Sequence, residues 1–370
     1  MTHSFEQRLS PLHDLHVAAG ASFTDFAGWL MPVRYSSDLA EHHAVRTAAG
    51  IFDISHMAEI RVAGADAAAF LDYALAGLIS AMPLGKAKYS LILDGSGGIL
   101  DDLIVYHDRP GQFFVVANAG NRHLVVDALR ERMGGFEVTI DDLTEQIVLI
   151  AVQGPRSRAI LDATAGLAVE GIEELKYYAC ADGSFAEKPI LVARTGYTGE
   201  DGYELYVSVP DAASLWSALL EAGAEHGLVP AGLASRDTLR LEAGMPLYGH
   251  ELGLDTLPVQ AGLGRVVNTT KDFVGRRAIE QGPAEGARVL VGLRSEGKRA
   301  GRAGYAVCDG PREVGVVTSG ALSPTLGFPI AMAYVDPELS EPGTALQIDV
   351  RGSRVAASVV ALPFYKRSVS

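Results

Sequence analysis

Residues 88–108 read KYSLILDGSGGILDDLIVYHD, and this stretch decides the fold class. Two segments rich in apolar residues flank the sequence GSGG at positions 95–98, which is a turn signal. A connection this short joins antiparallel neighbours, because parallel strands need a crossover of about a dozen residues or more. QFFVVAN at 112–118 predicts a third strand. The stretch therefore predicts antiparallel pairing within an α+β fold rather than a doubly wound parallel sheet.

Helices and strands alternate on both sides of this hairpin. Helical composition occurs at 4–20, 36–49, 66–76, 121–133, 156–165 and 211–223, and strands are predicted at 51–55, 58–64, 189–199 and 202–210. After about residue 283 the pattern changes to short strands with turn residues every eight to twelve positions. That spacing is typical of a small all-β domain, a barrel or a sandwich. We expect a boundary between residues 282 and 283.

The amino-acid composition argues against several classes of function. The chain has 31 Lys and Arg against 45 Asp and Glu, a formal net charge of −14, and no basic run that would indicate nucleic acid as a partner. No apolar run approaches the roughly 18 residues that a membrane span needs, and no signal peptide is visible. We therefore expect a cytoplasmic protein with a small-molecule ligand. Cys180, Cys308 and the histidines form no recognised metal pattern, so no metal site is expected.

Two adjacent carboxyl residues, Asp101 and Asp102, interrupt the apolar run of the second predicted strand. Side chains alternate faces along a strand, so one carboxyl group shares a face with Ile104 and Tyr106 and the other with Leu103. The two therefore cannot both line one cavity, which argues against a cooperating pair. A carboxylate among such residues is costly unless it is paired, so this is a candidate functional site; a solvated strand end is the alternative.

Two further segments carry unusual polar residues. RTGYTGEDGYEL at 194–205 places carboxyl groups and tyrosines around three glycines, which suits either a flat ring with a polar edge or an ordinary decorated hairpin. PAGLASRDTLRLEAG at 230–244 places Arg236 at the start of a helix. Arg236 could bind a ligand carboxylate in a bidentate manner, or pair with Asp237 or Asp201.

Eight segments, taken in order, resemble the T-proteins of the glycine cleavage system. They are FAGWLMPVRY, GIFDISHMAE, KYSLILDGSGGILDDLIVY, QGP, RTGYTGEDGYEL, PAGLASRDTLRLEAG, TKDFVGRRAI and TSGALSPTLG. The resemblance extends from about Pro11 to Tyr365. It implies a three-lobed disc around a central folate cavity, with two α+β lobes built on antiparallel sheets in residues 1–282, the second lobe (about 54–140) inserted in the first, and a β-barrel in 283–370.

The resemblance also implies an activity. T-proteins are tetrahydrofolate-dependent aminomethyltransferases that act on the aminomethyl group carried by the lipoyl arm of the H-protein, release ammonia and form 5,10-methylenetetrahydrofolate. The lipoylated H-protein and tetrahydrofolate are thus the expected partners. By position, Asp102 would be the catalytic carboxylate, and the expected cofactor-binding residues are Met57, Tyr89, Asn118, Tyr177, Tyr197, Glu204 and Arg236.

Three alternatives remain at this point. A folate-dependent demethylase of the same fold would act on another small donor. A non-catalytic folate-binding relative would carry a lysine-glycine-cysteine motif where this chain has KDFVGRR at 271–277, and a pure interaction protein would bind no folate. The chain also departs from the family at its C-terminus, where Lys366 and Arg367 follow Tyr365, and Arg367 is the candidate for the usual arginine contact with the folate tail.

Overall fold

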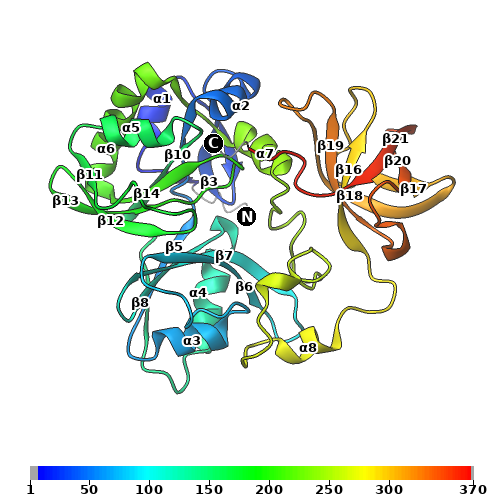
Figure 1. Cartoon of the computed structure of the whole chain (residues 1–370), viewed down its shortest axis with the longest axis horizontal. Coiled ribbons are helices and arrows are strands. Elements are labelled where there is room, and N and C mark those ends of the chain that lie inside the picture. Colours follow the sequence, from blue (N-terminus) through cyan, green and yellow to red (C-terminus); the bar gives the residue numbers. More distant parts are fainter. Residues whose placement is uncertain (1–6, 368–370) are drawn as a thin grey trace, which may run out of the picture.

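The fold is α+β and ends in a closed β-barrel (Figure 1). The structure, a computed structural model, describes residues 7–367. In Figure 1 a seven-stranded sheet lies at the upper left, a five-stranded sheet below it, and the barrel at the right. The helices are α1 (His13–Ala18), α2 (Asp38–Thr47), α3 (Ala67–Ala74), α4 (Arg122–Glu131), α5 (Ser157–Ala163), α6 (Val209–Gly223), α7 (Leu233–Glu242) and α8 (Arg276–Gln281).

The predicted hairpin is confirmed and forms the centre of the five-stranded sheet. Its strands are β6 (Lys86–Leu93), β7 (Ile99–Arg109), β8 (Gln112–Ala117), β5 (Ala58–Ala63) and β9 (Thr139–Asp142), in that spatial order and all antiparallel. The Asp94 carboxylate closes the turn by accepting hydrogen bonds from the backbone N–H groups of Ser96 (2.8 Å) and Gly98 (2.9 Å). Gly97 adopts a φ of +83°, a conformation that favours glycine.

The seven-stranded sheet is mixed. Its order is β11 (Leu167–Val169), β12 (Cys180–Phe185), β13 (Lys188–Ala193), β14 (Gly202–Ser208), β10 (Ile147–Gln153), β4 (Ala49–Asp53) and β15 (Leu228–Pro230). β15 runs parallel to β4, so the prediction of antiparallel sheets alone was wrong here. The reason is helix α6, which forms a crossover between β14 and β15 long enough to return the chain in the same direction.

A three-stranded sheet at the N-terminus contains β1 (Arg8–Leu9), β3 (Trp29–Arg34) and β2 (Ser22–Phe26), with β1 parallel to β3. The helix predicted over 4–20 is therefore shorter than expected and begins at His13; residues 4–6 lie outside the described range. The segment between the first two helices forms the β2–β3 hairpin.

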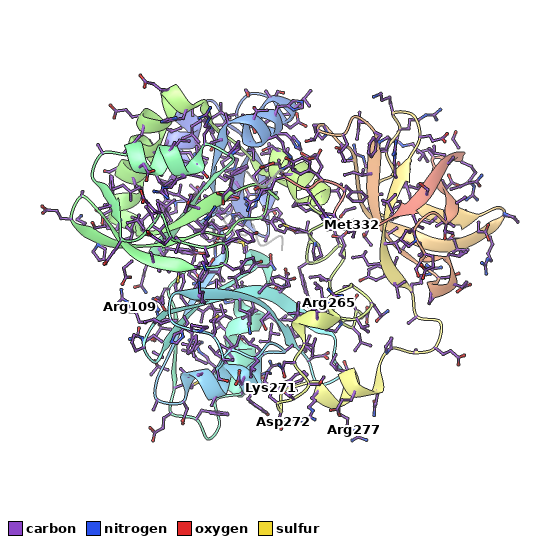
Figure 2. The ribbon with its side chains drawn as sticks, viewed as in Figure 1. Arg109, Arg265, Lys271, Asp272, Arg277 and Met332 are labelled. Atoms are coloured by element: carbon purple, nitrogen blue, oxygen red, sulfur yellow. The ribbon has the colours of Figure 1, made fainter. Side chains whose placement is uncertain are left out.

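The C-terminal strands close into a six-stranded antiparallel barrel, which decides between the two predicted architectures. Its order is β16 (Val289–Ser295), β19 (Pro329–Val335), β18 (Arg312–Leu322), β17 (Ala306–Asp309), β20 (Ala345–Val350) and β21 (Ser353–Val360). Met332 of β19 lies on the barrel face turned towards α7 (Figure 2), where it packs in one apolar cluster with Leu241.

A long, mostly irregular segment, residues 243–275, links α7 to α8. It lies between the five-stranded sheet and the barrel, and Figure 2 shows Arg265 on it. Near its end the Lys271 ammonium donates to the backbone carbonyl oxygens of Asp72 and Leu75 at the C-terminal end of α3. This attachment holds the segment against the five-stranded sheet. No helix within residues 7–367 is long and apolar enough to cross a bilayer.

Candidate functional site

A cavity of about 500 Å³ lies where the two large sheets and the linking segment meet. Strands β6, β7 and β14, the loop after β8, the first turns of α7, and residues 244–250 of the segment all contribute to its wall. Seven residues predicted from the sequence line it, although they come from widely separated stretches: Met57, Tyr89, Asp102, Asn118, Tyr197, Glu204 and Arg236. Their place on the wall does not by itself show what each of them binds.

Asp102 is the carboxyl residue of the pair that faces the cavity. It forms part of the wall with Ile104 and Tyr106, which lie on the same face of the strand, and Leu103 also contributes. Its Oδ2 accepts a hydrogen bond from the Tyr89 hydroxyl (3.0 Å) and its Oδ1 from the Asn118 side chain (2.8 Å). Burial raises the pKa of Asp102 to about 6, and the two hydrogen bonds partly oppose this by stabilising the charged form.

Asp101 is completely buried and absent from the cavity wall. Its carboxyl group is nevertheless connected to that of Asp102, because the Asn118 side-chain amide donates to Oδ1 of both residues, at 2.8 Å each. Burial, and then the negative charge of Asp102, raise the pKa of Asp101 to about 7. The two carboxyl groups thus do not share a cavity face, as the alternation of side chains along the strand predicted. That alternation did not reveal the Asn118 amide, which connects them from one side of the strand to the other.

Glu204 lies on β14 with one carboxyl oxygen fixed. Its Oε2 accepts hydrogen bonds from the hydroxyl groups of Thr195 (2.5 Å) and Tyr106 (3.2 Å). The Tyr206 hydroxyl donates in turn to Tyr106 (3.0 Å), so a buried polar chain supports this orientation. Glu204 is 6% exposed and lines the cavity, which leaves its other oxygen available to a donor on a ligand.

Arg236 has no carboxylate partner among the described residues, so the predicted alternative of pairing with Asp237 or Asp201 is wrong. Asp237 pairs with Arg240 (2.8 Å), and Asp201 pairs with Arg194 (2.6 Å). The guanidinium group of Arg236 instead lies over the Tyr197 ring, 5.1 Å from its centroid, and its Nη1 is buried without a hydrogen-bond partner. A buried donor of this kind is costly unless a ligand or water meets it.

Tyr178 lines the cavity, whereas the predicted Tyr177 does not. Tyr177 is 41% exposed and packs edge-on against the Tyr178 ring, with centroids 4.9 Å apart. The Arg367 guanidinium lies 5.5 Å from the centroid of the Tyr177 ring and 3.4 Å from the Asp201 carboxylate. Tyr177, Asp201 and Arg367 therefore form a polar group beside the cavity rather than part of its wall.

The sequence-based prediction missed several wall residues. His56 is buried, its Nδ1 lacks a hydrogen-bond partner, and burial lowers its pKa to about 4, so it is neutral at pH 7. Phe26 packs edge-on against it, with centroids 5.2 Å apart, and Tyr248 joins from the linking segment. His56 lies within GIFDISHMAE, one of the segments that carry the family resemblance, so its position in that motif was the available signal. No periodic pattern marks Tyr248, because it lies in an irregular segment.

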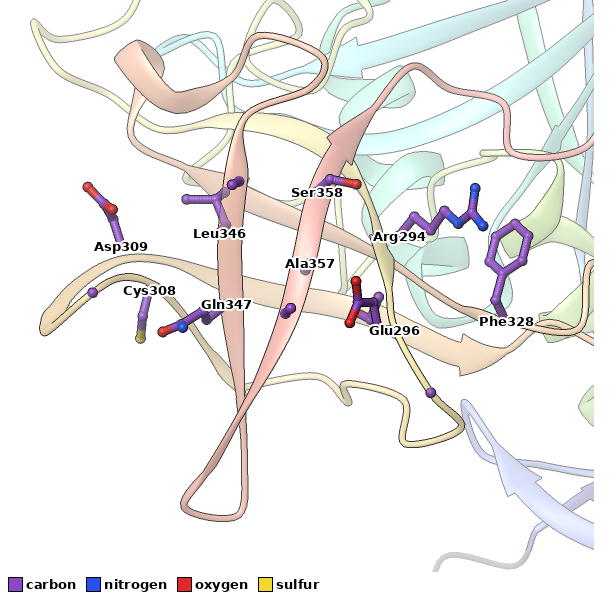
Figure 3. A pocket seen from close by; sticks show the side chains of 14 residues that line it. Arg294, Glu296, Cys308, Asp309, Phe328, Leu346, Gln347, Ala357 and Ser358 are labelled. Carbon is purple, nitrogen blue, oxygen red and sulfur yellow. The ribbon is translucent and has the colours of Figure 1, made fainter.

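A second cavity, of about 810 Å³, opens on the barrel (Figure 3). Its charged lining residues, Arg294, Glu296 and Asp309, are exposed, and Figure 3 shows Asp309 on the opposite side of the groove from Arg294 and Glu296. Polar groups that converge on one point are characteristic of ligand sites, and this groove lacks them. The smaller cavity is therefore the candidate site. Within residues 7–367 no group of three or more His, Cys, Asp or Glu side chains is arranged to hold a metal ion.

Comparison with known proteins gives a consistent result over the whole chain. Residues 12–271 match the family model of the GCVT N-terminal domain, and residues 288–366 match that of the glycine cleavage T-protein C-terminal barrel domain. The aminomethyltransferases of Cutibacterium acnes and Bacillus subtilis are 58% and 42% identical over 98% and 97% of this chain and 99% of their own lengths. The crystal structure of glycine cleavage system aminomethyltransferase T from Bartonella henselae superposes with a TM-score of 0.90 at 37% identity, covering 97% of this chain and 98% of that one.

Proposed function

The chain belongs to the glycine cleavage T-protein family and is an aminomethyltransferase, and from this premise we propose that the 500 Å³ cavity binds tetrahydrofolate and is the site of transfer. The reaction takes the aminomethyl group from the lipoyl sulfur of the H-protein, releases ammonia and yields dihydrolipoyl H-protein. Tetrahydrofolate supplies the nitrogen atoms that accept the one-carbon unit. The observation that carries the proposal is the set of three polar groups, Asp102, Glu204 and Arg236, around one cavity.

The residues of the cavity fit a folate. The volume of the cavity lies within the range of about 300–1,000 Å³ that small-molecule sites occupy. The free oxygen of Glu204 suits the donor-rich edge of a pterin ring. The unpaired guanidinium of Arg236 suits an acceptor on the ligand, and Tyr197, Tyr89 and Met57 offer apolar faces to flat groups.

We assign the central chemical role to Asp102. Loss of ammonia gives positive, iminium-like character to the carbon that is transferred, and a carboxylate placed nearby in a water-poor cavity stabilises that charge. The Asn118 and Tyr89 hydrogen bonds hold the Asp102 carboxyl group in one orientation. Its carboxylate can also accept a proton from an amine in reach.

The remaining assignments are proposals at a finer level. Asn118 contributes to the cavity wall. Tyr177 and Arg367 would meet the folate tail outside it, and their mutual contact supports this. We also propose a three-lobed disc around the cavity, with residues 1–282 as the folate-binding region, 54–140 inserted within it, and 283–370 as the barrel domain. The lipoylated H-protein is the proposed protein partner, and the cytoplasmic location expected from the sequence stays a prediction.

The decisive assay supplies the protein with tetrahydrofolate and H-protein carrying an aminomethylated lipoyl group. We expect ammonia and 5,10-methylenetetrahydrofolate in equal amounts, measured by coupled oxidation of the folate product. A matched reaction with H-protein that lacks the lipoyl group should give neither. If product formed instead from an N-methyl or sulfonium donor and not from the aminomethylated H-protein, the demethylase alternative would replace this proposal.

Glu204→Ala is expected to weaken tetrahydrofolate binding more than it slows the chemical step. The substitution removes a charge-assisted hydrogen bond worth about 1.5–3 kcal/mol, which corresponds to about 10- to 150-fold in Kd. Calorimetric titration of the full-length protein measures Kd directly. Glu225→Ala, at an exposed position, is the control and should bind as the wild type does. Unchanged affinity in Glu204→Ala would remove Glu204 from the site.

A further inference from the structure

The buried carboxyl group of Asp101 is fully occupied by donors from one short stretch of chain. Its Oδ2 accepts the backbone N–H of Asn118 (2.9 Å), and its Oδ1 accepts the side-chain amides of Asn118 and Asn121, both at 2.8 Å. Asp101 thus holds Asn118 at two points, one on its backbone and one on its side chain. This arrangement leaves Asn118 no freedom to rotate without breaking a bond to a buried carboxylate.

The same contacts fix which way the Asn118 amide points. Its Nδ2 lies 2.8 Å from Oδ1 of both Asp101 and Asp102. Nδ2 also lies 3.1 Å from the backbone carbonyl oxygen of Asp102, which can only accept hydrogen bonds. A flipped amide would place its own carbonyl oxygen against this acceptor, as well as against the two carboxyl oxygens. The amide therefore directs one N–H to each carboxyl group. The orientation of Asp102 in the cavity depends on this bridge on one side and on Tyr89 on the other.

We propose that Asp101 is a positioning residue for the transfer step, which acts on Asp102 through the side chain of Asn118. The proposal rests on the proposed function, because it takes Asp102 to be the catalytic carboxylate. In this arrangement Asp101 touches no substrate. It holds the Asn118 amide rigid, and the rigid amide keeps the Asp102 carboxyl group aimed at the reacting carbon.

The two carboxyl groups depend on hydrogen bonds from neutral groups, because no ion pair stabilises them. No Lys, Arg or His among residues 7–367 forms an ion pair with Asp101 or Asp102. Tyr89 from β6, and Tyr178, Tyr197 and Tyr248 from three other parts of the wall, are the titratable groups near the pair. Arg236 and His56 line the same cavity as Asp102 but form no ion pair with either carboxyl group. The hydrogen bonds from Asn118, Asn121 and Tyr89 are therefore the contacts that stabilise the two adjacent buried carboxyl groups.

A double-mutant cycle on full-length protein tests the proposal. Asp101→Asn, which brings an amide N–H against one of the three donors, should lower kcat by about 10- to 100-fold, the range expected when a catalytic group is misplaced by about 1 Å. Asn118→Ala should lower kcat by a similar factor. If Asp101 acts through Asn118, the double variant should be no slower than Asn118→Ala alone. The tetrahydrofolate Kd of Asp101→Asn should change less than about threefold, because the chemical step is affected and not binding.

The possible results separate this proposal from a structural role and from the proposed function. If the kcat losses of the two single variants multiply in the double variant, or if Asp101→Asn has a normal kcat, the positioning role of Asp101 is overturned. Loss of turnover in Asp102→Asn with normal turnover in Asp101→Asn would overturn this inference and leave the proposed function intact. Asp141→Asn, an exposed change of the same kind on β9 of the same sheet, should leave kcat unchanged.

A second variant keeps the test open if Asp101→Asn does not fold. Asn121→Ala removes a single side-chain donor from Asp101, and Asn121 is not part of the cavity wall. The backbone hydrogen bond from the Asn121 N–H to the Asn118 carbonyl oxygen (3.0 Å) does not involve the side chain that is removed. It should lower kcat several-fold with tetrahydrofolate still bound at one site per chain. A normal kcat in Asn121→Ala, together with a misfolded Asp101→Asn, would count against the positioning role.

Discussion

Asp102→Asn is expected to lower kcat by about two orders of magnitude or more, while tetrahydrofolate binding changes little. The asparagine keeps the size of the side chain and can still accept the Tyr89 hydrogen bond. It removes the negative charge, and in a cavity with little water that charge would stabilise the developing positive charge by about 3–4 kcal/mol. Because the charge acts mainly in the transition state, kcat and kcat/KM should fall together.

The pH dependence of turnover gives an independent measurement of the same role. Burial raises the pKa of Asp102 to about 6, so the reactive carboxylate form is lost as the pH falls through this value. Wild-type kcat should therefore decrease below about pH 6, and the residual turnover of Asp102→Asn should lack that decrease. Asp127→Asn, on the exposed face of α4, should retain both the rate and the profile of the wild type. Near-normal turnover in Asp102→Asn would assign the chemistry to another residue.

The hairpin and the barrel could be predicted from sequence because each depends on local signals. The turn at 95–98 and the alternation along 99–109 belong to one short stretch, and the barrel strands recur at regular spacing. The parallel pairing of β15 with β4 could not be predicted in this way. It depends on where helix α6 returns the chain, and a three-residue strand carries too little pattern to show its partner.

The site was predicted less completely, for two physical reasons. Periodicity showed that Asp101 and Asp102 face opposite sides, but only the packing of the two sheets shows that Asp102 faces the cavity. Whether Arg236 lacks an ion-pair partner depends on the ion pairs that other residues form. Asp237, for example, pairs with Arg240. The choice between Tyr177 and Tyr178 depends on a backbone conformation that no motif reveals, for Tyr178 has a φ of +59°.

Glu242 connects the barrel to the rest of the molecule through a buried network of hydrogen bonds and ion pairs. The carboxylate of Glu242, at the end of α7, accepts hydrogen bonds from Arg46 of α2 (2.8 Å) and from the hydroxyl groups of Ser323 and Thr325 in the barrel. His42 Nε2 lies 3.2 Å from the same carboxylate. The neighbouring apolar contact of Leu241 with Met332 completes the junction.

These contacts determine how the stability of the junction should depend on pH. The hydrogen bonds and positive charges around Glu242 lower its pKa from 4.5 to about 2, against the opposing effect of burial. A lowered carboxyl pKa adds stability above its unfolded-state value of about 4.5, and this contribution is lost as the pH falls towards 2. A shift of this size corresponds to about 3 kcal/mol.

Glu242→Ala is expected to reduce the free energy of unfolding by about 3–5 kcal/mol at pH 7, because it leaves Arg46 buried with Glu200 as its one remaining carboxylate partner. Urea unfolding at several pH values measures the difference from wild type, which should be constant above about pH 5 and shrink below 4.5. Glu280→Ala breaks the exposed pair with Arg276 and should cost less than about 1 kcal/mol. A loss this small in Glu242→Ala as well, or a difference independent of pH, would mean that apolar packing at Leu241 and Met332 alone holds the barrel in place.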